Sequence, residues 1–154
     1  MYRDGGWGRL VYQGKYETGR FDDELVQACV EMLGDWRPSP APMWLTCVPS
    51  LRHPTLVPEF AERLALALGL PFRATLRQLR ARPEQKSRQN SVQQARNVDG
   101  SLGIVEGVQV PDAPVLLVDD MVDSRWTFTL ATWVLRGAGC GPVHPLALAK
   151  SGGG

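Results

Sequence analysis

The sequence lacks the features of membrane and secreted proteins. None of its apolar runs approaches the roughly 20 residues that a membrane-spanning helix needs. Its first ten residues, MYRDGGWGRL, contain no apolar signal segment. The three cysteines, Cys29, Cys47 and Cys140, are too few and too widely spaced for a disulfide framework or a zinc-binding Cys-x-x-Cys pair. We therefore expect a cytoplasmic protein, without a membrane partner, whose thiols stay reduced.

The sequence also has little net charge. Its 17 Lys and Arg residues and 16 Asp and Glu residues leave +1, which argues against nucleic-acid binding through bulk charge alone. The charges are nevertheless unevenly placed, because seven basic residues lie between positions 73 and 96, where Glu84 is the only acid. That stretch carries +6 and the rest of the chain carries −5, so a local basic patch stays open.

The apolar pattern predicts a single α/β domain over residues 1–154. Short apolar runs predict strands over residues 43–48, 71–76, 101–105, 115–118 and 141–149. Helical spacing of apolar residues predicts helices over residues 25–33, 58–68 and 126–136, whereas residues 9–16 fit either a short strand or the entry to a helix. In the last helix, Trp133 is expected to pack in the core or against the sheet. This order predicts a mainly parallel central sheet flanked by helices, with a separate polar loop over residues 77–100.

The turn after the strand at 115–118 carries most of the candidate chemistry. Asp119 and Asp120 are expected to end this strand, where they could accept hydrogen bonds from sugar hydroxyls or help to hold a divalent metal. The free N–H groups of the helix that begins near residue 126 suit an anion such as phosphate, and Ser124 and Thr127 add hydroxyl donors. The turn therefore fits a sugar phosphate.

Other interpretations of this turn are weaker or purely structural. Asp123 or Ser124 could serve only as the N-cap of the helix, with the other acids solvated. A Walker B strand also runs apolar residues into acids, but the chain has no GxxxxGK[ST] loop to accompany it. An acidic site of the response-regulator kind finds no further support in the sequence.

Residues 115–127 resemble the signature of type I phosphoribosyltransferases, in which an apolar strand, two acids and a phosphate loop bind phosphoribosyl pyrophosphate. The resemblance implies Mg²⁺ as cofactor, with Asp119 and Asp120 near the metal and the ribose. It implies a catalytic role for Asp123, which resembles the residue beside the purine ring in the 6-oxopurine branch. Arg125 departs from the pattern, because the family usually has Gly there, and this leaves turnover open. The residues implied to bind the ribose and its phosphate are Asp119, Asp120, Ser124, Arg125, Trp126 and Thr127.

Segments outside the signature extend the resemblance. Residues 9–16, 48–54 and the loop that ends at residues 96–100 resemble ComF-type competence proteins. Residues 47–54, 85–86, 89–91 and 147–149 resemble more closely the phosphoribosyltransferase-like module at the C-terminus of some bacterial RecQ-family helicases. The family pattern implies a hood region and a flexible loop over residues 77–100 that closes over the site, although a solvated basic loop fits as well. It also implies a pyrophosphate loop after the first core strand. The residues of the pyrophosphate loop are Ser50, Leu51 and Arg52, and those of the flexible loop are Lys86, Arg88 and Arg96.

Three functions follow as hypotheses. The first is a domain that binds phosphoribosyl pyrophosphate or a nucleotide with Mg²⁺, with or without transferring phosphoribose to or from a nucleobase. The second is a non-catalytic DNA-repair or competence module that acts with a RecQ-type helicase or binds single-stranded DNA through the basic stretch. The third is a nucleotide sensor without catalysis. A homodimer is compatible with each of them.

Overall fold

A computed structural model describes residues 6–49, 53–78, 102–122 and 126–150. The chain begins with helix α1 (Gly6–Gln13), which continues directly into the π-helical turn η1 (Gly14–Thr18). Gly19 ends this segment with a φ of 77°, a conformation that glycine adopts without strain. Of the two structures that the sequence left open for residues 9–16, the helix is therefore the one that forms.

Helices α2 (Asp23–Trp36) and α3 (Leu56–Leu68) follow the predicted patterns. The carboxylate of Asp22 caps α2 by accepting a 2.8 Å hydrogen bond from the backbone N–H of Glu24. Gly69 ends α3 with a φ of 75°. Helix α3 starts two residues before the predicted Pro58, because Leu56 and Val57 already turn their side chains into the core.

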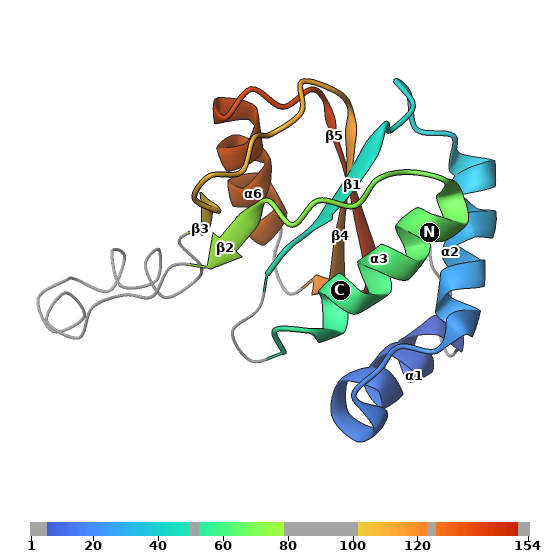
Figure 1. The fold of residues 1–154 in the computed structure, drawn as a ribbon. Helices are drawn as coiled ribbons and strands as arrows, with labels where there is room; N and C mark the ends of the chain where they lie inside the picture. The colour runs from blue at the N-terminus through green and yellow to red at the C-terminus, as the bar shows by residue number, and fades with distance from the viewer. Residues whose placement is uncertain (1–5, 50–52, 79–101, 123–125, 151–154) are drawn as a thin grey trace, which may run out of the picture.

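The central sheet is parallel, as the sequence predicts. It consists of β1 (Trp44–Cys47), β4 (Val115–Val122) and β5 (Val143–Lys150) in the order β1-β4-β5. Figure 1 shows helix α6 (Trp126–Gly137) on one side of this sheet and α2 and α3 on the other. The protein therefore has the predicted α/β architecture, with the carboxyl ends of β1 and β4 at the same edge of the sheet.

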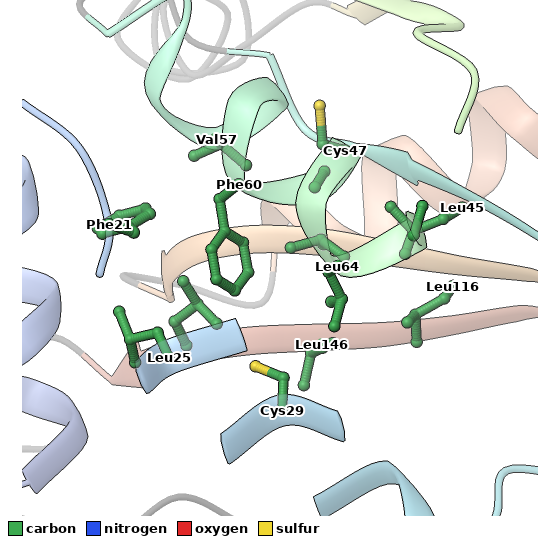
Figure 2. Packing of buried hydrophobic residues seen from close by; sticks show 14 of the residues in the cluster. Phe21, Leu25, Cys29, Leu45, Cys47, Val57, Phe60, Leu64, Leu116 and Leu146 are labelled. Carbon is green, nitrogen blue, oxygen red and sulfur yellow. The ribbon is translucent and has the colours of Figure 1, made fainter. Parts of the chain in front are cut away.

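Alternate residues of the strands belong to two apolar clusters, one on each face of the sheet. Leu45, Leu116 and Leu146 face α2 and α3, where Phe60 and Leu64 of α3 meet them. Figure 2 shows these side chains pointing toward one another between the helices and the strands. The opposite face of the sheet packs on α6 through a second buried cluster, whose members are Trp44, Val48, Leu76, Leu102, Val115, Leu117, Ala131, Leu135 and Cys140.

The segment predicted as a strand over residues 71–76 differs in the structure. Only Phe72 pairs beside β1, through an isolated parallel bridge to Leu45, and the regular strand β2 covers Leu76–Gln78. After Phe72, the segment stays beside β1 as far as Thr75, whose hydroxyl oxygen forms a 3.0 Å hydrogen bond with that of Thr46 in β1. Strand β2 then pairs antiparallel with β3 (Leu102–Ile104) in a separate two-stranded sheet (Figure 1).

Two expectations about the last third of the chain are corrected. Strand β4 does not end at the acids but runs on to Val122, so Asp119 and Asp120 lie within it, and Asp119 pairs with Ala147 of β5. Trp133 does not pack in the core, because 74% of its side chain is exposed. Helix α6 turns Ala131 and Leu135 to the sheet, and position 133 lies on its other face.

The three cysteines are buried free thiols, as expected from their number and spacing. Burial raises the pKa of Cys29 and of Cys47 to about 12. Among the described helices, none combines the length and apolar character that crossing a membrane requires.

Candidate functional site

The candidate site is built around two adjacent acids near the carboxyl end of β4. Successive side chains of a strand point to opposite faces of the sheet, so Asp120 follows Leu116 and Val118 toward the helices α1 to α3. The backbone N–H of Asp120 donates a 2.8 Å hydrogen bond to Oδ1 of Asp119, which holds the first carboxyl group against the strand.

A lysine from the other end of the chain reaches this acid pair. Nζ of Lys15, in η1, lies 3.1 Å from Oδ2 of Asp120. Only 17% of the Lys15 side chain and 12% of the Asp120 side chain are exposed, so the ion pair is mostly shielded from water. Sequence reasoning did not single out Lys15. Its only signal was its place in the 9–16 segment that carries the wider resemblance.

The electrostatics of the two acids differ. The pKa of Asp119 is raised to about 8, first by burial and second by the negative charge of Asp120. Burial lowers the pKa of Lys15. The charge of Asp120 and the hydrogen bond to it, together with Tyr16 and Asp119, outweigh this effect, so the net shift of the pKa is upward. Burial and the charge of Asp120 therefore favour the protonated form of Asp119, beside an Asp120 that faces an ammonium group.

Aromatic side chains surround the same end of the N-terminal segment. The rings of Tyr12 and Tyr16 lie 4.9 Å apart, and Tyr16 meets the imidazole of His53 edge-on at 6.3 Å. Nζ of Lys15 lies 5.7 Å from the centre of the Tyr16 ring. Tyr12 and Tyr16 are 54% and 57% exposed, so both rings offer planar surfaces to solvent, and the ring of Tyr16 lies beside Lys15, the partner of Asp120.

Solved structures share this architecture. An adenine phosphoribosyltransferase matches with a TM-score of 0.58 and 16% identity over 84% of this chain and 69% of its own. A purine phosphoribosyltransferase from Pyrococcus horikoshii matches with a TM-score of 0.53 and 19% identity over 83% and 72%, respectively. The chain has the type I phosphoribosyltransferase fold. No protein-family model matches the sequence, and no curated protein sequence is significantly similar to it.

The same fold also forms part of a larger enzyme. The allosteric regulatory enzyme of purine biosynthesis matches with a TM-score of 0.54 and 23% identity over 80% of this chain. This chain spans only 25% of that enzyme's length. The phosphoribosyltransferase fold thus occurs both in chains of similar size and as one portion of longer chains.

The phosphoribosyltransferase fold brings together only part of the predicted site. Asp119 and Asp120 share one strand, and α6 begins at Trp126 with a half-buried Thr127 after it. The backbone N–H of Val48 bonds to the carbonyl of Val118, so the chain approaches the predicted pyrophosphate loop beside β4. The predicted residues that lie outside the described ranges are Ser50, Leu51, Arg52, Lys86, Arg88, Arg96, Asp123, Ser124 and Arg125.

The described residues alone do not form a protein-only metal site. Within the ranges that the structure covers, no group of three or more His, Cys, Asp or Glu side chains could hold a metal ion. Asp120 has the ammonium group of Lys15 beside it, and Asp119 is held by the strand backbone. The assignment of a metal to Asp119 and Asp120 therefore stays a prediction.

Proposed function

We propose that this protein binds a phosphorylated ribose, as phosphoribosyl pyrophosphate or as a nucleotide, at the carboxyl edge of its parallel sheet. The observation that carries the proposal is the position of Asp119 and Asp120 near the carboxyl end of β4, the strand that precedes α6. Ligands of open α/β sheets bind at this edge. The phosphoribosyltransferase fold of the solved structures supports the same ligand class.

The two acids suit the ribose hydroxyls in different ways. The Asp120 carboxylate accepts hydrogen bonds, and its charge is balanced by Lys15. Asp119, whose pKa lies well above the ordinary range of a carboxyl group, can donate a hydrogen bond as well as accept one near neutral pH. The pair can therefore satisfy two neighbouring hydroxyl groups, each of which is both a donor and an acceptor.

The phosphate ends of the ligand are assigned by sequence. In this proposal the turn at Ser124, Arg125 and Thr127 binds the 5′-phosphate, with the N-terminus of α6 behind it. Ser50, Leu51 and Arg52 bind the pyrophosphate, and Lys86, Arg88 and Arg96 close over it. Mg²⁺, when bound, would supply positive charge to the pyrophosphate. Because the described acids do not form a protein-only metal site, no step is assigned to the ion.

Transfer of phosphoribose is a finer proposal than binding. Asp123 would act as the base toward a nucleobase, and catalysis in such a site consists mainly of positioning and electrostatics. Arg125, in the place of the usual Gly, either crowds the phosphate or binds it. A kinship with ComF-type proteins and RecQ-associated modules rests on the sequence motifs alone. No described residue favours the single-stranded DNA or helicase alternative over ribose-phosphate binding.

Isothermal titration calorimetry tests the proposal. Phosphoribosyl pyrophosphate with Mg²⁺, and separately a panel of nucleoside monophosphates, are titrated into the wild type, the double variant Asp119→Asn with Asp120→Asn, and the control Asp112→Asn. Asp112 is an exposed acid away from the strand end. We expect binding by the wild type and the control and none by the double variant. A wild type that binds neither kind of ligand would overturn the proposal.

A further inference from the structure

The ion pair between Lys15 and Asp120 joins the N-terminal segment to the acid pair. Its two side chains are mostly shielded from solvent, at 17% and 12% exposure, and its atoms lie at charge-assisted hydrogen-bond distance, 3.1 Å. A pair in such surroundings is screened less by salt than a surface pair. Lys15 is therefore a fixed neighbour of Asp120 and differs from a mobile surface cation.

The packing of η1 fixes the place from which Lys15 approaches. Gly14, the residue before it, is buried against the ring of Phe21, and a Cβ at position 14 would collide with that ring. The backbone at Gly14 thus lies closer to the core than any other residue type would allow. Lys15 follows directly in the chain, and its Nζ reaches Asp120 of β4.

A divalent cation at the acid pair would meet this ammonium group. Proteins usually bind Mg²⁺ through one or two carboxylates together with water, and Asp120 is the acid of the pair that has a cationic partner. A metal would have to displace Lys15 from Asp120 or bind against its charge. Displacement would leave a largely shielded ammonium group without its counter-ion, which is costly.

We propose that the ammonium group of Lys15 takes the place of a divalent cation on Asp120. The acid pair then binds sugar hydroxyls with Lys15 as its resident cation, and any metal in the site belongs to the phosphates of the ligand. Lys15 acts as a positioning residue, because it acts through Asp120. The inference depends on the proposed function only for the identity of the ligand, since metal binding to the free protein is measured without one.

Mn²⁺ titration followed by electron paramagnetic resonance tests this assignment. The proteins are the wild type and the variants Lys15→Met, Lys15→Arg and Lys15→Met with Asp120→Asn, each in the absence of ligand. Met keeps an unbranched side chain of similar length, and Arg keeps the charge. We expect Lys15→Met to bind Mn²⁺ at least about tenfold more tightly than the wild type, a change worth about 1.4 kcal/mol. Lys15→Arg should resemble the wild type, and the double variant should lose the gain.

Two results would overturn the proposal. One is equal Mn²⁺ affinity in the wild type and Lys15→Met, provided that thermal unfolding shows the variant to be folded. The other needs no Lys15 variant: if Asp120→Asn alone lowers the Mn²⁺ affinity of the wild type, the acid pair already holds the metal in the presence of Lys15. Failure of the proposed function would appear separately, as the lack of ligand binding in calorimetry.

Discussion

Gly14 packs directly against the aromatic ring of Phe21, in the segment whose next residue, Lys15, pairs with Asp120. Phe21 is fully buried, and its ring meets Phe60 of α3 edge-on at 5.6 Å between centroids. The ring is thus held by the core on one side and meets the backbone of η1 on the other. The residue that follows Gly14 is Lys15, which pairs with Asp120. Two adjacent residues of η1 therefore contact the core and the acid pair.

This contact predicts opposite effects of the same substitution at two glycines. Gly14→Ala should lower the free energy of unfolding by about 1–3 kcal/mol, because the new methyl group overpacks the Phe21 ring. Gly8→Ala, in α1, should raise it by about 0.5–1 kcal/mol, since nothing lies near its Cβ and alanine favours the helix. Urea unfolding monitored by circular dichroism measures both. Equal effects of the two substitutions would contradict the close packing at position 14.

A second prediction concerns the arginine that ties α3 to the start of α2. Arg63 donates hydrogen bonds to the carboxylates of Asp23 and Glu59 and to the carbonyl oxygen of Phe21, and 19% of its side chain is exposed. Arg63→Met should lower the free energy of unfolding by about 2–3 kcal/mol, because charged hydrogen bonds are lost and the Phe21 carbonyl loses its partner.

Arg20 provides the matched control. It also pairs with Asp23 and Glu59, at 3.8 and 3.5 Å, but its side chain is 55% exposed. Arg20→Met should change stability by less than about 1 kcal/mol, as exposed ion pairs usually contribute little. The two variants are compared in the same urea series. If Arg20→Met lost more free energy of unfolding than Arg63→Met, the exposure of the side chain would not determine how much these contacts contribute to stability.

The acid pair predicts a pH dependence of stability. Since the pKa of Asp119 is raised to about 8 in the folded protein from its ordinary value near 3.8, the folded state binds more protons in between. The contribution of Asp119 to stability is therefore fully present below pH 4 and is lost as the pH rises toward 8. Asp119→Asn removes this dependence, so its stability relative to the wild type should increase from pH 4 to pH 8.

Unfolding curves over this pH range check the sign. The control is Asp112→Asn, at an exposed loop position. Its difference from the wild type should not show the same rise. A difference between Asp119→Asn and the wild type that stays constant from pH 4 to 8, or that falls, would contradict a raised pKa for this carboxyl group.

The parts of the molecule that sequence could predict are those that depend on local patterns. The continuous apolar run before Asp119 predicts a buried parallel strand, and this strand is observed. The four-residue spacing of Phe60 and Leu64 predicts the inner face of α3, which is also observed. The prediction that Trp133 packs in the core is wrong, because position 133 lies on the face of α6 opposite Ala131 and Leu135. Apolar character alone does not tell which face of a half-covered helix is solvated.

The parts that sequence could not predict are contacts between distant segments. Lys15 and Asp120 meet because the N-terminal segment packs on the sheet, with α1 against β5, and the sequence pattern of neither segment predicts the contact. The observed strand β2 begins later than the strand predicted over residues 71–76 for a related reason. Phe72 forms only an isolated bridge with Leu45, and the regular pairing of β2 depends on β3, more than twenty residues later. Local propensity is the weaker influence when a partner strand decides the pairing.

The exposed tyrosine beside the acid pair predicts a preference among ligands. If a nucleotide places its ribose on Asp119 and Asp120, its base lies within reach of the Tyr16 ring, which is 57% exposed and whose centre is 5.7 Å from Lys15 Nζ. Stacking of a base on an aromatic ring contributes about 1–3 kcal/mol. Tyr16→Ala should therefore weaken the binding of nucleoside monophosphates by about tenfold or more. Ribose 5-phosphate, which has no base, should bind as before.

Tyr16→Phe separates stacking from hydrogen bonding, because it keeps the ring and removes only the hydroxyl group. Calorimetry with both ligands on the wild type, Tyr16→Ala and Tyr16→Phe should show that Phe restores nucleotide affinity. If Tyr16→Ala weakens ribose 5-phosphate as much as the nucleotide, the side chain supports the fold of η1 and does not contact the base. If Tyr16→Phe is as weak as Tyr16→Ala, the phenol hydroxyl, and not the ring, makes the contact that matters.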